Sequence, residues 1–479
     1  MFAHLLNKEL RAFVHSPRFV GTFIVGVCLI LLSVYIGIRE YQAAVDHARA
    51  SQQLSDQRMR EGNSWMRLSA RTYRTPEPMM IFVSGLTFDI GQWSDITTQS
   101  GVRLQHSSYS DDPIFAVFRF IDFAFIVTIV MSLFALLYTY DAVSGEREDG
   151  TLKLVFSNPV PRAQYLLAKA AGAWIGLTSA LAVPAALGIL LVMLFGVPFG
   201  PADWLKLALL MTFSALLSGC FVMIGLLIST LTRHSSVSFL VGLMSWVVLS
   251  LILPRTGAAI AGQLVPVPSV AEIQGQREAY AQDRWNKFMK EGSERWGRVP
   301  ATDEMTDEAL QAQMQMEDSL RRQVDRDINT YEAGLFSDLR RKKARQESMA
   351  LSLARVSPAT AYHLAAMSLA GTDIALKTRY EDAMNAYRDQ FTAYVEKKEA
   401  ENPGQGAVRI AMDSEKGMNI QASRDAGALD ISGIPTFSRE RRDMSSILPS
   451  LITNFGLLAV MLLACLAGSA IAFARYDVR

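Results

Sequence analysis

Cysteine is scarce in this chain, and a recognisable loop for nucleotide phosphates is missing from it. Only three cysteines occur among 479 residues. Cys28, Cys220 and Cys465 all fall within long apolar runs, so the sequence predicts neither a disulfide scaffold nor a zinc site. No Gly-x-x-x-x-Gly-Lys-Ser/Thr segment is present, although such a loop is what holds phosphates on backbone amides. The sequence therefore predicts no nucleotide site of this kind on this chain.

The chain also has no excess of basic residues and no recognisable catalytic motif. The formal net charge is +1, and no basic, aromatic-rich patch typical of nucleic-acid binding is found, so no nucleic-acid partner is predicted. The six histidines are scattered without the spacing of metal ligands. No nucleophile elbow or other catalytic motif stands out. We expect no catalytic, cofactor-binding or metal-binding residue on this chain.

Long hydrophobic runs are what the sequence does contain, and half of its residues are hydrophobic. About 20 apolar residues in a helix cross the roughly 30 Å of hydrocarbon in a bilayer. The sequence predicts an α-helical polytopic membrane protein with six transmembrane helices, the first an uncleaved anchor. Pro184 predicts a tilt or kink in the third. The expected spans are residues 19–38, 115–138, 166–195, 205–230, 237–253 and 447–473.

The distribution of Lys and Arg in short loops predicts the orientation, because these residues are held on the cytoplasmic side. They precede the first span, follow the second and the fourth, and end the chain. We expect residues 1–18 to form an amphipathic helix in the cytoplasmic interface, and residues 139–165 and 474–479 to be cytoplasmic. Both termini are then cytoplasmic, and residues 39–113 and 254–446 lie on the outer side.

The segments assigned to the outer side are soluble in composition and mainly helical. Apolar residues recur at steps of three or four in residues 306–339 and again in residues 372–401. We expect these two stretches to form an antiparallel helical hairpin. Residues 39–71 are expected to continue the first span as a helix. Residues 74–105 are expected to supply a few strands, and residues 404–430 to be irregular or weakly β.

The most informative segment is the polar stretch at residues 141–154, between the second and third spans. Ser144 can cap a short helix there. Glu146 and Glu148 complement the positive N-terminal end of such a helix, and Gly150 permits a sharp change of direction. A short rigid helix with charged flanks is suited to fit a groove on a soluble motor protein.

The connection to the third span is also distinctive. Pro159 and Pro161 stiffen it, and Arg162 and Lys169 are available for the lipid surface or for a partner protein. An ordinary charged cytoplasmic loop obeys the same orientation rule. The residues by themselves therefore leave both interpretations open.

The loop resembles the one between the second and third spans of ABC-2-type permeases, including those of nitrous-oxide reductase maturation and gliding motility. Residues 357–362, 369–372, 434–437 and 473–479 resemble, in order, the subgroup with a large outer insertion before the last span. The resemblance implies a six-span subunit that pairs with a second permease and with two ATPase subunits, which carry ATP and Mg. It also implies coupling to the ATPase through Ser144, Gly145, Glu146, Arg147, Glu148, Gly150, Thr151, Leu152, Pro159 and Arg162.

Arg119 and Asp122 form a second candidate site at the start of the second predicted span. Three residues apart on a helix, they can share a face, and charges at membrane depth usually turn inward and pair. A role in the translocation pathway or an outer gate is one interpretation. An ion pair that fixes the position of the helix is the other.

We therefore predict the non-catalytic permease subunit of an ABC-2-type exporter in the bacterial inner membrane, in contact with lipid and with an extracytoplasmic protein partner. Outer segments that contain no cysteine agree with this location. Two other functions stay open. One is a membrane scaffold or sensor without transport activity, and the other is a membrane-embedded enzyme.

Overall fold

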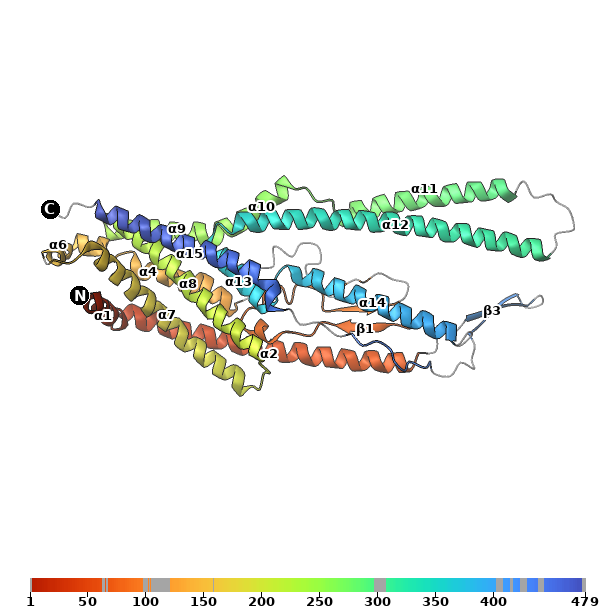
Figure 1. Cartoon of the computed structure of the whole chain (residues 1–479), viewed down its shortest axis with the longest axis horizontal. Coiled ribbons are helices and arrows are strands. Elements are labelled where there is room, and N and C mark those ends of the chain that lie inside the picture. Colours follow the sequence, from red (N-terminus) through yellow and green to blue (C-terminus); the bar gives the residue numbers. More distant parts are fainter. Residues whose placement is uncertain are drawn as a thin grey trace. The chain divides into compact units, whose positions relative to one another are not determined.

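The computed structural model describes residues 2–62, 65, 68–97, 102, 104, 121–157, 159–296, 307–401, 408–413, 417–422, 429–437 and 443–475. Six helices among these residues are long and apolar enough to cross a membrane (Figure 1). The predicted number of spans is thereby confirmed. The six are Pro17–Arg60 (α2), Phe123–Glu148 (α3 to α5), Arg162–Leu194 (α7), Pro201–Leu231 (α8), Ser235–Leu264 (α9 to α10) and Met444–Ala474 (α15).

The longest of the six, α2, has 44 residues and a well-defined start. Ser16 Oγ accepts a hydrogen bond from the backbone N–H of Phe19 at 3.2 Å, and Pro17 takes the first helical position. Both features favour the beginning of a helix. The helix continues well past residue 38, as expected for the segment from residue 39 onward, although it ends at Arg60 and not near residue 71.

Two other spans differ from their expected bounds. The second helix begins at Phe123, and residues 105–120 lie outside the described part of the chain. The fifth continues past residue 253 to Leu264, because Arg255 ends the apolar run without ending the helix. The segments of these two helices are α3 (Phe123–Phe125), the π-helix η4 (Ile126–Met131), α4 (Ser132–Thr139), α9 (Ser235–Val247), the π-helix η5 (Val248–Ile252) and α10 (Leu253–Leu264).

The chain divides into two compact units, residues 1–254 with 355–479, and residues 255–354. The segment expected on the outer side, residues 254–446, is thus divided between the two units, and its location relative to the membrane stays a prediction. Only its first 100 residues form a unit of their own, and the remainder belongs with the membrane helices. The physical reason is that the apolar face of the later part is buried within the first unit.

The smaller unit contains an antiparallel helical hairpin of α11 (Val270–Trp296) and α12 (Asp307–Ala354) (Figure 1). The rings of Tyr280 and Tyr331 stack 4.0 Å apart, and Arg277 pairs with Glu332 at 2.7 Å. The predicted hairpin was wrong in its second helix. The apolar stripe of residues 372–401 is buried elsewhere, so α11, which precedes α12, supplies the partner.

In the larger unit, that stripe belongs to α14 (Ala375–Glu401), where Tyr380, Met384 and Phe391 are buried. Lys398 donates to Asp430 at 2.8 Å and holds the pKa of that carboxyl well below its usual range. An antiparallel pair of strands, β1 (Ala70–Tyr73) and β2 (Trp93–Ile96), adjoins α14. A second antiparallel pair, β3 (Val408–Asp413) and β4 (Gly417–Ala422), lies in the segment expected to be weakly β.

Of the six candidate spans α8 is the most enclosed, and α4, α7, α13 (Pro358–Ala370) and α15 pack on it. Every residue of α13 is buried, and its Tyr362 hydroxyl lies 3.0 Å from that of Ser214 on α8. A Cβ on Gly225 of α8 would lie 2.0 Å from Thr139 Oγ1. The close approach of α4 and α8 therefore depends on a residue without a side chain.

Candidate functional site

The polar stretch forms two short helices joined by a turn. They are α5 (Ser144–Glu148) and α6 (Thr151–Phe156). Gly150 separates them with a φ of +72°, a left-handed conformation that L side chains rarely adopt. The sharp change of direction lies at the glycine where it was predicted. Leu152 is buried, whereas Thr151, Lys153 and Leu154 are exposed.

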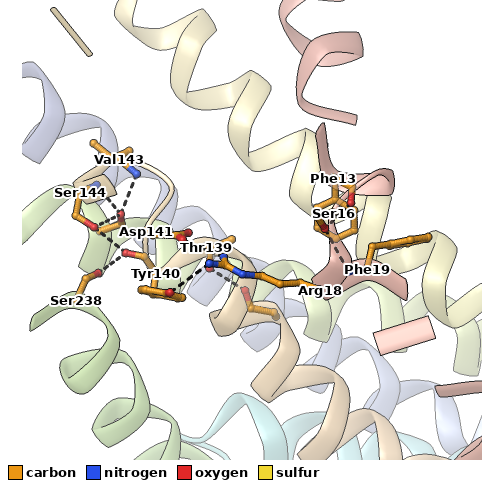
Figure 2. Close-up of polar contacts among 12 residues, drawn as sticks. Phe13, Ser16, Arg18, Phe19, Thr139, Tyr140, Asp141, Val143, Ser144 and Ser238 are labelled. Atoms are coloured by element: carbon orange, nitrogen blue, oxygen red, sulfur yellow. Dashed lines mark hydrogen bonds and ion pairs between the residues drawn. The ribbon is translucent and has the colours of Figure 1, made fainter. Parts of the chain in front are cut away.

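Ser144 does not cap the first helix. Val143 occupies the capping position, and Ser144 is the first helical residue and fully buried. Ser229 on α8 reaches it instead, and Ser229 Oγ accepts hydrogen bonds from the backbone N–H groups of Val143 at 2.9 Å and Ser144 at 3.0 Å. Ser144 Oγ donates to the carbonyl of Tyr140 at 2.9 Å (Figure 2). The cap comes from another helix because α5 starts against the end of α8.

The charged residues after Ser144 brace α5 against its neighbours. Arg147 donates to the carbonyl of Thr232 at 2.7 Å, at the C-terminal end of α8. Glu148 accepts from the backbone N–H of Ser235 at 3.0 Å, at the start of α9. Each charge has the sign that complements the adjoining helix end. These two predicted coupling residues thus contact the membrane helices of their own chain.

Glu146 contacts the third apolar helix and is linked through it to the N-terminal helix α1 (Phe2–Val14). Lys169 on α7 lies 2.8 Å from Glu146 and 3.6 Å from Glu9 on α1, and its side chain is 9% exposed. The Tyr165 hydroxyl donates to Glu146 at 2.5 Å. The expectation that Lys169 faces lipid or a partner was wrong, because two carboxylates draw the ammonium group inward.

The helix α1 lies against α7 at unusually short range. A Cβ on Gly172 would lie 2.8 Å from Cβ of Glu9, and one on Gly176 would lie 2.4 Å from the ring of Phe13. Two glycines four residues apart give α7 a flat strip that admits a second helix closely. This spacing is a signal in the sequence for close packing of a second helix, separate from the loop motif.

The end of α1 and the start of α2 also contact this region. Arg18, in the first turn of α2, pairs with Asp141 at 2.9 Å (Figure 2). The ring of Phe13 on α1 lies 4.3 Å from that of Tyr138. The Tyr138 hydroxyl is 2.7 Å from that of Thr22 on α2. The N-terminal helix, the first span and the α5 region therefore form one packed layer.

Two of the predicted coupling residues lie at the end of the loop that leads into α7. One of them contacts another helix, and the other is exposed. Arg162 donates to the carbonyls of Phe473 at 3.3 Å and Ala474 at 2.9 Å, at the C-terminal end of α15. This position is favourable for a cation near the negative end of the helix dipole. Arg162 therefore faces its own chain, whereas Pro159 is exposed.

Two hollows flank α1 on this face. One has a volume of about 470 Å³ and is lined by the acids Glu9, Asp141, Glu146 and Asp149 as well as by Arg18 and Lys169. The other, about 330 Å³, lies between α1 and the start of α7 and is lined by Leu5, Lys8, Val155, Pro159 and Val160 among others. The exposed end of α6, with Leu154 at 69% exposure, and these hollows form a surface that we call the α1–α6 face.

Asp122 lies at the start of the second apolar helix. It caps the helix that begins at Phe123, with its carboxylate accepting from the backbone N–H of Phe125 at 2.7 Å. It also accepts from the backbone N–H and the hydroxyl of Ser84 at 2.9 and 3.0 Å. Arg119 lies outside the described residues. Asp122 thus fixes a helix start to the preceding loop.

A test of the α5 packing follows from Ser229. Replacing it by alanine leaves the N–H groups of Val143 and Ser144 buried without this acceptor, which costs about 1–3 kcal/mol for each group. We expect faster hydrogen exchange at residues 143–148 in Ser229→Ala. Ser218→Ala is the matched control, because that hydroxyl donates only to a carbonyl within its own helix. Equal protection in both variants would contradict the assigned role.

Comparison with known proteins agrees with this architecture. A family model for the ABC-2 family transporter protein matches residues 3–478. Over 86 residues, 17% of this chain, the sequence is 45% identical to the probable ABC transporter permease protein NosY of Stutzerimonas stutzeri, and the match covers 30% of that protein. The chain therefore belongs to the ABC-2 family of transporter proteins, and its six long apolar helices make it a multi-pass membrane protein.

Proposed function

We propose that this chain pairs with a second permease to form the translocation pathway of an ABC exporter, and that a separate ATPase dimer drives it through the α1–α6 face. ATP and Mg would be bound by the ATPase. The chain would lie in the bacterial inner membrane with both termini and the α5–α6 loop in the cytoplasm. The hairpin of α11 and α12 would then face the outer side, where a protein partner can reach it.

The observation that carries this proposal is the bracing of α5. Its charged side chains contact the ends of α8 and α9 and the first turns of α7, through Arg147, Glu148 and Glu146 respectively. A force applied to α6 would therefore be transmitted through these contacts to three membrane helices. An ordinary surface loop would leave these charges in water, since exposed ion pairs contribute little to stability.

This division of roles changes what the individual residues are expected to do. The exposed residues Thr151, Lys153 and Leu154 are suited to contact the ATPase, and the exposed Pro159 borders the same surface. Glu146 and Arg147 act as positioning residues that hold α5 in place. Leu154, exposed at the tip of α6, is the natural apolar anchor, because interface energy concentrates in a few such side chains.

Leu154→Asp tests the proposal directly. We expect the aspartate variant to lose at least tenfold of the ATPase that co-purifies with the wild-type chain, because a charge at an interface core costs several kcal/mol. The variant should keep the wild-type elution profile and helical content, since Leu154 packs against little of its own chain. Met289→Asp provides a control at another exposed apolar position, on α11 and outside the six apolar helices.

The outcome also separates the competing functions. A wild-type chain that co-purifies with no ATPase would contradict the proposal and favour a scaffold or sensor. Retention of the ATPase by Leu154→Asp would place the contact elsewhere. Stimulation of ATP hydrolysis by the wild-type permease, measured in reconstituted vesicles, is the second readout.

A further inference from the structure

A dense basic segment on α12 stands apart from the α1–α6 face. The segment consists of Arg340, Arg341, Lys342, Lys343 and Arg345, and no acidic residue lies among them. All of these cations except Lys343 are exposed. Arg341 forms an ion pair with the flanking Asp338, and the two side chains are 78% and 57% exposed. Such exposed pairs contribute little to stability and leave the charge accessible.

The turns of α12 that follow this segment lie beside the end of an apolar helix. A Cβ on Gly257 of α10 would lie 2.9 Å from the backbone nitrogen of Ala354. The side-chain amide of Gln346 donates to the carbonyl of Val265 at 2.8 Å. Residues 346–354 therefore run antiparallel to residues 257–265, and α10 itself completes the fifth membrane helix.

Both helices carry exposed apolar side chains in the part where α10 and α12 run side by side. Ile260 and Leu264 on α10 are 45% and 61% exposed, and Met349 and Leu353 on α12 are 37% and 38% exposed. On each helix the two residues are four apart and share a face. Arg345 lies one turn before Met349, about 6 Å along the axis. The surface of α12 thus changes from cationic to apolar within a single turn.

We propose that the basic segment binds the headgroups of anionic phospholipids, with Ile260, Leu264, Met349 and Leu353 immersed at the edge of the hydrocarbon. A change from apolar to cationic side chains along one helix matches the change from acyl chains to phosphates across a membrane surface. Arg binds a phosphate through two parallel N–H donors, and Lys contributes a compact charge. The proposal rests on the membrane location of α10 and is independent of ATPase coupling.

The test uses the purified full-length chain in detergent, with native mass spectrometry of bound lipid. Phosphatidylglycerol and phosphatidylcholine with identical acyl chains are titrated separately. We expect the wild-type chain to bind phosphatidylglycerol more tightly. In the quadruple variant R340Q/R341Q/K342Q/R345Q, the affinity for phosphatidylglycerol should fall at least about tenfold, since each cation near a membrane surface contributes to attraction. Binding of phosphatidylcholine should not change.

A second quadruple variant, K287Q/K290Q/R321Q/R326Q, removes four exposed cations from the same hairpin away from α10. This variant should keep the wild-type preference for phosphatidylglycerol over phosphatidylcholine. Glutamine is compatible with a helix at all eight substituted positions. Circular dichroism and gel filtration verify that both variants fold. No preference for phosphatidylglycerol in the wild-type chain, an unchanged affinity in the first variant, or an equal loss in the second would each overturn the proposal. An acidic protein segment would then be the better occupant.

Discussion

Transport and ATP hydrolysis are expected to become uncoupled when Lys169 is replaced by methionine. The change leaves Glu9 and Glu146, 23% and 22% exposed, facing each other without the cation that joins them. Removing one partner of a buried pair costs about 3–5 kcal/mol, and partial exposure reduces this to about 2–3 kcal/mol. Since 1.4 kcal/mol is about tenfold, the braced arrangement of α5 should be populated about 30- to 140-fold less. The measurement is ATP hydrolysis and substrate movement in reconstituted vesicles.

Lys206 supplies a matched control for this experiment. It also lies between two carboxylates, 3.6 Å from Glu77 and 3.9 Å from Asp203, and its side chain is 11% exposed. Lys206→Met should lower stability without uncoupling, because its partners lie far from α5 in the chain. Adding Glu9→Gln and Glu146→Gln to Lys169→Met should restore part of the coupling, since no charge is then left unpaired. Uncoupling of equal size in Lys206→Met would reject the specific role of Lys169.

The second large effect is expected from Gly37→Ala. A Cβ at this position of α2 would lie 2.5 Å from the carbonyl oxygen and 3.0 Å from Cα of Ile81, both backbone atoms that cannot rotate away. Overpacking of this kind costs about 1–3 kcal/mol, and we expect the upper end because Ile81 belongs to a buried 3₁₀ turn, Pro78–Ile81 (η2). The variant should elute largely as aggregate after detergent extraction.

Gly21→Ala is the comparison in the same helix, because no atom beyond its own stretch of helix backbone lies within 4 Å of the position that its new methyl group would occupy. That variant should gain slightly in stability, since alanine favours a helix interior over glycine by up to about 1 kcal/mol. Thermal aggregation followed by light scattering distinguishes the two. If both variants melt together, the contact between α2 and η2 does not restrict the fold.

Periodicity and charge predict the apolar helices well, because long apolar runs have few alternatives in a membrane protein. Helix ends were less predictable. The fifth helix outlasts its apolar run because Gly257 lets α12 pack closely on it, a contact between residues nearly 100 positions apart. The wrong hairpin has the same origin. Both α11 and α14 are amphipathic enough to pair with α12, and only tertiary packing decides between them.

The candidate site illustrates the same limit in another way. Local rules identified Gly150 as a turn, because a left-handed residue is a property of one position. They assigned Ser144 as a helix cap, since its partner Ser229 is 85 residues away and gives no local signal. The charges Glu146, Arg147 and Arg162 looked available to a partner. Their actual contacts are with helix ends and with Lys169, which depend on how separate segments meet.

The length of α2 has a mechanical consequence. One uninterrupted helix of 44 residues is about 66 Å long. Near its first turn Arg18 holds Asp141, and near its other end Ser55 Oγ accepts from the backbone N–H of Arg71 on β1 at 2.8 Å. A lever of this length magnifies small rotations, and tilting it by about 10° swings the distant tip by about 11 Å. Small rotations of α2 about Arg18 would thereby reach β1 as displacements close to the diameter of a helix, about 10 Å.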